Sequence, residues 1–176
     1  MKITVYNEKG GCGKSTVSVL LAVMLDAELI DLDAQQTSTE WLKQRQDERK
    51  INVGSWIIDC PPGISMETAA AISDADIVLI PVRASFNDLI HLPQTIKFVR
   101  THGAKKVAFV GSDIDSRTND QDTLKEALQG YGYQIAGVLT HRASYRRAGL
   151  SGQLASDFDA VAAAEAATLI SNLRSL

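Results

Sequence analysis

Short apolar runs alternate with longer runs of helical periodicity along most of this 176-residue chain. The apolar runs are continuous, which is typical of parallel strands that are buried on both faces. They lie near Lys2–Tyr6, Glu28–Leu32, Ser55–Asp59, Ile77–Pro81, Val107–Gly111 and Ile135–Leu139. Strands that alternate with helices in this way predict an α/β fold of three layers, in which helices cover both faces of a twisted, mostly parallel sheet.

Several of the helices have recognisable ends. Thr37 and Glu40 have the spacing of a capping box, which predicts that a helix begins there. Ser85 is placed to cap another helix, which ends before Gly103. The last helix has one apolar face, formed by Ala162, Ala166, Leu169, Leu173 and Leu176. Because the chain has no internal repeat and no clear linker, we expect residues 1–176 to form a single domain.

The first strand leads into the octet Lys9-Gly10-Gly11-Cys12-Gly13-Lys14-Ser15-Thr16, and an apolar helical run follows it. Glycines let consecutive backbone N–H groups turn towards one anion, and the N-terminus of the next helix adds positive potential. We therefore expect the residues from Gly10 to Thr16 to bind the phosphates of a nucleotide. Lys14 is placed to reach the β- and γ-phosphates, and the Ser15 hydroxyl to bind Mg²⁺.

Carboxylates follow two of the predicted strands, at Asp33 and Asp59. Because the carboxyl ends of parallel strands meet at one edge of the sheet, both side chains are expected near the phosphate loop. An aspartate that ends an apolar strand, as Asp59 does, is typical of a residue that holds Mg²⁺. The N–H of Gly63, in the turn after Asp59, can approach a γ-phosphate because no Cβ obstructs it. For Asp33 a helix cap is the alternative.

These motifs resemble those of the ParA-type partition ATPases, which belong to the ParA/MinD superfamily of P-loop NTPases with a deviant Walker A sequence. The resemblance rests on K-G-G-x-G-K-[ST], with Glu8 in the first glycine position, and on D-x-P-P-G after the third strand. The segment Asp31-Leu32-Asp33-Ala34-Gln35 also matches, with alanine in place of the usual proline. The resemblance covers Lys2 to about Leu173, which is nearly the whole chain.

The resemblance implies a three-layer P-loop NTPase fold with ATP and Mg²⁺ as cofactors. It implies that Asp33 positions the attacking water and joins Ser15 and Asp59 around the magnesium. Two subunits would enclose two ATP molecules, and Lys9 of each would reach the phosphates of its partner. The chain resembles a small form that lacks the N-terminal DNA-binding extension.

Partition of plasmids or chromosomes is the function that this resemblance implies. The ATP-bound homodimer would bind nonspecific DNA, and a centromere-binding adaptor protein of ParB type would stimulate hydrolysis. The segment R-x-x-Y-R-x-A assigns DNA contacts to Arg142, Arg146 and Arg147. Ser112, after the fifth strand, lies where relatives contact the base. Arg83 stands in a segment that lies near the dimer interface in relatives.

Composition adds limits to this picture. A net charge of −3 shows that the chain is not globally basic, so any DNA contact must come from a local patch. No apolar stretch approaches the roughly 20 residues that span a membrane, so we expect a cytoplasmic, nucleoid-associated protein with no membrane partner. Cys12 and Cys60 both lie in nucleotide motifs, as apolar filler or as a redox pair. The histidines have no metal-ligand spacing.

Three other functions within the same superfamily remain open. A ParA-like ATPase can position another cargo, such as a microcompartment or a chemosensory cluster, and the sequence does not separate this from DNA partition. A MinD-like membrane-associated ATPase should end in a basic amphipathic helix, but the last turns carry one cation, Arg174. An electron carrier resembling the nitrogenase iron protein needs cysteines that are free to hold a cluster.

Overall fold

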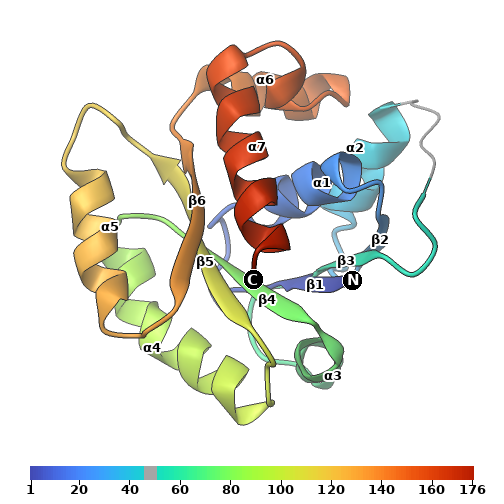
Figure 1. Ribbon diagram of the computed structural model, residues 1–176. Helices are drawn as coiled ribbons and strands as arrows, with labels where there is room; N and C mark the ends of the chain where they lie inside the picture. Colours follow the sequence, from blue (N-terminus) through green and yellow to red (C-terminus); the bar gives the residue numbers. More distant parts are fainter. Residues whose placement is uncertain (46–50) are drawn as a thin grey trace.

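The computed structural model describes residues 1–45 and 51–176, which form one sheet between two layers of helices (Figure 1). All pairs of neighbouring strands are parallel, in the order β2-β3-β1-β4-β5-β6. The strands are β1 (Lys2–Val5), β2 (Glu28–Asp31), β3 (Trp56–Asp59), β4 (Ile77–Val82), β5 (Val107–Ile114) and β6 (Gln134–Thr140). The predicted α/β architecture is confirmed.

Helices cover both faces of this sheet (Figure 1). One layer contains α1 (Lys14–Met24), α2 (Thr37–Arg45), α6 (Ala143–Ser151) and α7 (Ala160–Arg174). The other contains α3 (Met66–Asp74), α4 (Phe86–Thr101) and α5 (Asp120–Gln129). A 3₁₀ turn, η1 (Ala155–Asp157), lies between α6 and α7. None of the helices in the described ranges is long and apolar enough to cross a membrane.

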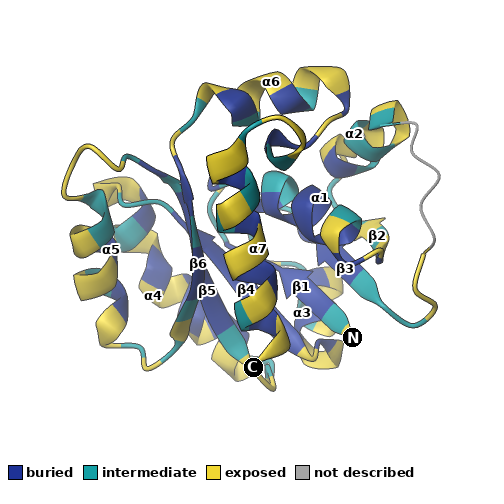
Figure 2. Cartoon of the chain, turned by 45° about the horizontal axis from the view of Figure 1, so that its top comes forward, coloured by how far each residue is buried: buried dark blue, intermediate teal, exposed yellow. Residues whose placement is uncertain are grey.

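The core has two halves, one on each face of the sheet. In β4, Ile77 and Leu79 pack with α1 and α7, whereas Val78 and Ile80 pack with α3, α4 and α5. Figure 2 shows the buried residues running along the central strands, with exposed residues on the outer sides of the helices. Each aliphatic side chain that is fully buried contributes about 1.5–3 kcal/mol. Burial on both faces explains why the central strands are continuous apolar runs.

The predicted strands all lie in the right places, but β5 is longer than expected. It continues to Ile114 because its pairing with β6 extends as far as Thr140. Ser112 and Asp113 are therefore inside β5, not after it. The register shifts between Ser112 and Ile114, and Asp113 has a φ of 58°, in the left-handed region. The irregular end of this strand lies at the edge where the site is found.

The capping box predicted at Thr37 and Glu40 is wrong in its cap residue. Helix α2 does begin at Thr37, but the backbone N–H groups of Ser38 and Thr39 donate to the carboxylate of Asp31, at 3.1 and 3.2 Å. A carboxylate accepts such bonds better than a hydroxyl does, and β2 ends close enough to supply it. Asp31 thus holds the start of α2.

The other two predictions about helices are confirmed. Ser85 caps α4, and its hydroxyl accepts a bond from the N–H of Asp88 at 3.2 Å. In α7 the predicted apolar face is buried: Ala166, Leu169 and Leu173 lie in the core with the sheet, and Ala162 packs with Ala148 and Ala155. Leu176 lies beyond the helix and packs against the same core.

Candidate functional site

The loop between β1 and α1 encloses a cavity at the carboxyl edge of the sheet. Gly11 and Gly13 have φ values of 75° and 93°, which other residues rarely adopt. At Gly13 a Cβ would also lie 2.2 Å from Oγ of Ser112, so the position requires glycine. The cavity, here called the loop cavity, measures about 350 Å³ and is lined by Gly10, Gly11, Gly13, Lys14, Ser15, Thr16, Asp33 and Pro62.

Lys14 is folded into the loop. The residue is only 6% exposed, and its Nζ donates to the backbone carbonyl of Lys9 at 2.7 Å. Nζ also lies 3.9 Å from Sγ of Cys12. A buried ammonium that bonds to neutral acceptors gains a stronger partner when an anion arrives. Lys14 is therefore placed to bind an anion in the loop cavity.

Lys9, the second lysine of the octet, is held inside its own subunit. Its Nζ forms an ion pair with Asp88 at 2.6 Å, and Asp88 is 2% exposed. The Ser85 hydroxyl donates to the same carboxylate oxygen, Oδ2, while Oδ1 is buried and has no hydrogen-bond partner in the part of the chain that the structure describes. Sequence reasoning missed Asp88 because the cap of α4 already explained an acidic residue at this position.

Asp59 ends β3 and is almost completely buried, at 1% exposure. The Ser18 hydroxyl donates to its Oδ1 at 3.0 Å, and Oδ2 is buried with no hydrogen-bond partner among residues 1–45 and 51–176. Burial raises the pKa of this carboxyl, and the nearby hydroxyls of Ser15, Ser38 and Ser18 oppose that rise. The sequence predicted Asp59 and Ser15 at this edge but gave no reason to include Ser18 or Ser38.

A divalent cation fits beside Asp59. The unpartnered Oδ2 and the nearby Ser15 hydroxyl are the oxygen ligands that Mg²⁺ prefers. In residues 1–45 and 51–176, no three His, Cys, Asp or Glu side chains gather as a metal site. Mg²⁺ commonly binds through one or two protein oxygens and completes its shell with waters and substrate phosphates. The donors present here match that mode of binding.

Asp33 and Asp31 have separate roles. Asp33 lines the loop cavity, and its carboxylate accepts a local bond from the N–H of Gln35 at 2.9 Å. Asp31 is used to cap α2, as described above. Asp33 is therefore the carboxylate of this segment that faces the cavity.

The sequence predicted that the N–H of Gly63 would approach a γ-phosphate, but in the structure it bonds to the phosphate loop itself. Its φ is 85°, and its N–H donates to the carbonyl of Glu8 at 2.8 Å. The Tyr6 hydroxyl donates to the Gly63 carbonyl at 3.2 Å. A turn with proline neighbours can present this N–H to a backbone acceptor of the phosphate loop, which satisfies it. The turn after Asp59 and the phosphate loop are thus directly joined.

A second cavity, here called the α6 cavity, adjoins the first. It measures about 380 Å³ and shares Gly11, Gly13 and Thr16 with the loop cavity. Its other walls are Arg83, Ser112, Asp113, Leu139, Thr140, His141, Arg142, Tyr145 and Arg146. Ser112, the residue predicted to lie near a base, is therefore beside the phosphate loop.

Charged groups from three strand ends meet in the wall of the α6 cavity. Arg83 forms an ion pair with Asp113, and Nδ1 of His141 lies 2.6 Å from the other oxygen of the Asp113 carboxylate. Burial alone would raise the pKa of Asp113, but the hydrogen bonds from His141 and Arg83 hold it below its ordinary value. The carboxylate is charged at neutral pH. The sequence gave His141 no role, since spacing along the chain does not reveal this contact.

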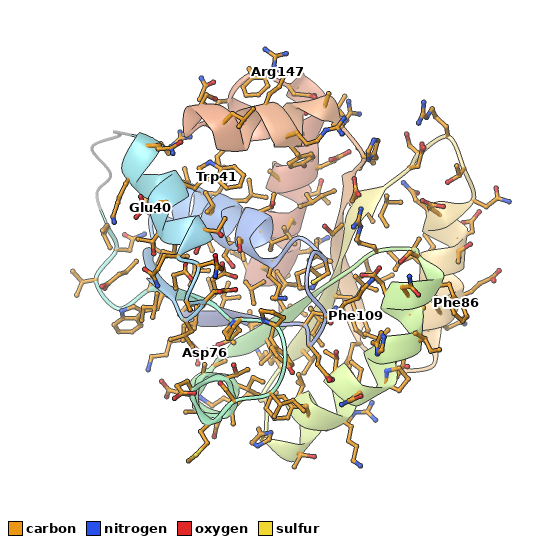
Figure 3. All side chains as sticks on the ribbon, turned by 180° about the vertical axis from the view of Figure 1, so that it is seen from behind. Glu40, Trp41, Asp76, Phe86, Phe109 and Arg147 are labelled. Carbon is orange, nitrogen blue, oxygen red and sulfur yellow. The ribbon has the colours of Figure 1, made fainter. Side chains whose placement is uncertain are left out.

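The three arginines expected to bind DNA do not form one outward stripe. Arg142 precedes α6, and its side chain donates to Thr140 at 3.0 Å and lies 3.6 Å from Asp159. Arg147 lies over the ring of Phe158, on the outer side of α6 in Figure 3. Arg146 is exposed beside the α6 cavity. Arg142 turns inward because acidic groups of η1–α7 attract it, so the outer surface retains Arg146 and Arg147.

The two cysteines are buried. Burial raises the pKa of the Cys12 thiol, and it raises the pKa of Cys60 to about 12. Thiolates, not thiols, are the reactive species. The geometry therefore favours apolar filler over the redox pair.

Comparisons with known proteins agree with this geometry. The family described as CobQ/CobB/MinD/ParA nucleotide binding domain matches residues 3–155. Maintenance of carboxysome distribution protein A of Halothiobacillus neapolitanus is 26% identical over 181 residues, which cover 85% of this chain and 84% of that protein.

Two solved structures share the fold. A putative plasmid partition protein from Borrelia burgdorferi, bound to AMPPNP, has a TM-score of 0.83 at 17% identity and covers 99% of each chain. An ATP complex of a Cyanothece McdA variant has a TM-score of 0.78 at 15% identity and covers 98% of this chain and 95% of that one. Since the family match spans most of the chain and falls on the loop, Asp33 and Asp59, the protein belongs to the CobQ/CobB/MinD/ParA nucleotide-binding family.

Proposed function

We propose that this protein is a Mg²⁺-dependent ATPase that positions a large cellular cargo. The observation that carries the proposal is the convergence of Lys14, Ser15, Asp33 and Asp59 at the carboxyl edge of one parallel sheet. A cation, a hydroxyl and two carboxylates around a glycine loop are the groups that phosphoryl transfer requires.

Each group has a distinct task in this proposal. The loop N–H groups and Lys14 bind the β- and γ-phosphates, and they stabilise the charge that develops on them. Ser15 and Asp59 hold Mg²⁺, which neutralises phosphate charge when it is bound. Asp33 faces the loop cavity and orients the attacking water. Ser112 contacts the nucleoside in the α6 cavity.

ATP-dependent dimerisation is the second part of the proposal. Lys9 reaches the phosphates bound by the partner subunit only after it leaves Asp88, its present partner at 2.6 Å. The free carboxylate then retains the bond from the Ser85 hydroxyl. Exchange of one anionic partner for another makes dimerisation depend on bound nucleotide.

Positioning of a protein cargo is better supported than partition of DNA. The relative from Halothiobacillus neapolitanus covers most of both chains, and its name describes carboxysome distribution. Partition of a plasmid or chromosome is the second candidate, because a Borrelia burgdorferi structure of the same fold is described as a plasmid partition protein. Both candidates use the same nucleotide site.

We propose that the ATP-bound dimer binds the DNA of the nucleoid, over which the cargo moves. Arg146 and Arg147 lie at the exposed side of α6, and a dimer presents two copies of each. Phosphate contacts of this kind bind DNA without reading its sequence. A cargo-bound adaptor, of ParB type in the case of DNA partition, stimulates hydrolysis and releases the dimer.

Deletion of the gene in its own organism, followed by imaging, separates the two candidates. Cargo positioning predicts that protein bodies lose their even spacing while plasmids and chromosomes are inherited normally. Loss of plasmids or chromosomes with normal spacing of protein bodies would favour DNA partition. Purified protein that hydrolyses no ATP in the presence of Mg²⁺, nonspecific DNA and the adaptor would refute both.

A further inference from the structure

Arg83 joins the phosphate loop to two strand ends. It follows β4 directly, and its Nη1 donates to the carbonyl of Gly11 at 3.2 Å. Its Nη2 forms the ion pair with Asp113 in β5, and His141 after β6 contacts the same carboxylate. Arg83, Asp113 and His141 are here called the Arg83 cluster. The cluster extends from the end of the edge strand β6 to Gly11 of the phosphate loop.

Asp113 is held tightly in this cluster. Its φ of 58° lies in the left-handed region, which is unfavourable for a residue with a side chain. The strand pairing is also irregular at this point. Strained residues of this kind persist where the surroundings over-determine them, and they gather at ligand sites. Here each carboxylate oxygen of Asp113 has its own side-chain partner, Arg83 after β4 and His141 after β6, and these two contacts hold the residue in place.

Gly11 is the part of the loop that most needs such support. It is exposed, its φ is 75°, and a Cβ at this position would meet no atom within 4 Å. A glycine in open space can rotate its peptide groups at little cost. In a trans peptide the carbonyl and the following N–H point in opposite directions. A bond from Arg83 to the Gly11 carbonyl therefore turns the N–H of Cys12 to the opposite side of the loop.

We propose that Arg83, held by Asp113 and His141, is a positioning residue that keeps the phosphate loop in its phosphate-binding conformation. The proposal rests on the proposed function, because it assumes that phosphates bind in the loop cavity. Arg83 acts through the backbone of Gly11 and not through the base. It should therefore strengthen binding of any polyphosphate, with or without a nucleoside attached.

The test compares three ligands against one substitution. Arg83→Met keeps most of the apolar stem and removes both donors. Calorimetric titration with ATP, ADP and inorganic tripolyphosphate, each with Mg²⁺, should show a loss of about tenfold in affinity for all three. In steady-state ATP hydrolysis KM should rise by a similar factor while kcat stays within about twofold, as expected when binding alone is weakened.

Arg117→Met is the matched control. Arg117 also pairs with an aspartate near the end of β5, Asp115, at 2.7 Å, but it does not line either cavity. Its affinity for all three ligands should equal that of the parent. Arg83→Lys keeps a positive charge beside Asp113 and a donor for the Gly11 carbonyl. Its affinity for the three ligands should therefore lie between those of Arg83→Met and the parent. It also supplies the measurement where Arg83→Met does not fold.

Two results would overturn the proposal. Affinities for all three ligands equal to those of the parent would show that Arg83 does not support the loop. A loss of affinity for ATP and ADP, with that for tripolyphosphate unchanged, would show that the cluster contacts the nucleoside. Failure of the proposed function would give a different result. If the parent protein hydrolyses no ATP but binds tripolyphosphate more tightly than Arg83→Met does, the proposed function is wrong and the positioning role of Arg83 stands.

Discussion

Substitution of Asp33 by alanine separates nucleotide binding from hydrolysis. The carboxylate faces the loop cavity and accepts a local bond from the N–H of Gln35, at 2.9 Å. Lys14, Ser15 and Asp59 remain in place, so ATP and Mg²⁺ still bind. The attacking water loses the carboxylate that orients it, so ATP-bound dimers should accumulate.

The size of each effect follows from these contacts. Positioned acid–base groups commonly contribute a factor of about 10²–10⁴, so kcat should fall at least about 100-fold, or roughly 2.7 kcal/mol. The affinity for ATP should stay within about threefold. Loss of one partly exposed local hydrogen bond should lower the free energy of unfolding by about 0.5–1.5 kcal/mol.

Asp115→Ala provides the matched control. Asp115 accepts the equivalent local bond from the N–H of Arg117, also at 2.9 Å, and lies outside the loop cavity. Thermal melts, calorimetric ATP titration and phosphate release should be measured for both variants. If Asp33→Ala hydrolyses ATP at the parent rate, as Asp115→Ala should, Asp33 is only a turn residue and the catalytic assignment is wrong.

Three further predictions follow from the same geometry. Asp88→Asn should still form ATP-dependent dimers in light scattering. The double variant with Lys9→Met added should bind ATP and remain monomeric, and if both variants dimerise equally, Lys9 does not act at the interface. Burial raises the folded-state pKa of Asp59 above its unfolded value, so stability is lost as pH rises through the folded-state pKa. Asp59→Asn should therefore raise the melting temperature of the nucleotide-free protein at pH 7, and the gain should vanish below the unfolded pKa of about 4. Changing Arg146 and Arg147 together to alanine should reduce the slope of log K against log salt for DNA binding by the ATP dimer by up to about 3.6, at 0.9 for each of four arginines, and an unchanged slope would place the DNA contact elsewhere.

The fold was predictable because its signals are local and repeated. Continuous apolar runs identified every strand of the sheet, and the glycine-rich octet identified the phosphate loop. The aspartates at strand ends fell on the right edge because parallel strands share that edge by construction. These features depend on the order of residues along the chain and not on distant contacts.

The missed features depend on which segments the fold places side by side. Lys9 and Asp88 are 79 positions apart, and the sequence explained each of them separately. Asp31 replaced Thr37 as the cap of α2 because the end of β2 lies beside the helix start. Arg142 turned inward for the same kind of reason, towards acidic groups of a later helix. Pairings of this kind follow from packing, which no local pattern encodes.

The interface between α2 and α6 is another such contact. Figure 3 shows Trp41 of α2 lying beneath α6, where its Nε1 donates to the carbonyl of Gln153 at 2.9 Å. Its ring packs on Gly149, where a Cβ would lie 3.6 Å away. Since α2 begins a few residues after Asp33, this contact joins the helix that follows Asp33 to the helix that carries Arg146 and Arg147.

Lys14 gives the most direct test of the central claim, that the loop cavity binds ATP. Lys14→Met removes the ammonium that now bonds to the Lys9 carbonyl at 2.7 Å, and exposed Lys125→Met serves as the control. Both variants should be shown to be folded by thermal melts, and then titrated with ATP and Mg²⁺ in a calorimeter. The account predicts at least about a tenfold loss of affinity for Lys14→Met, about 1.4 kcal/mol, and none for the control. A folded Lys14→Met protein that binds ATP as tightly as the parent would contradict it.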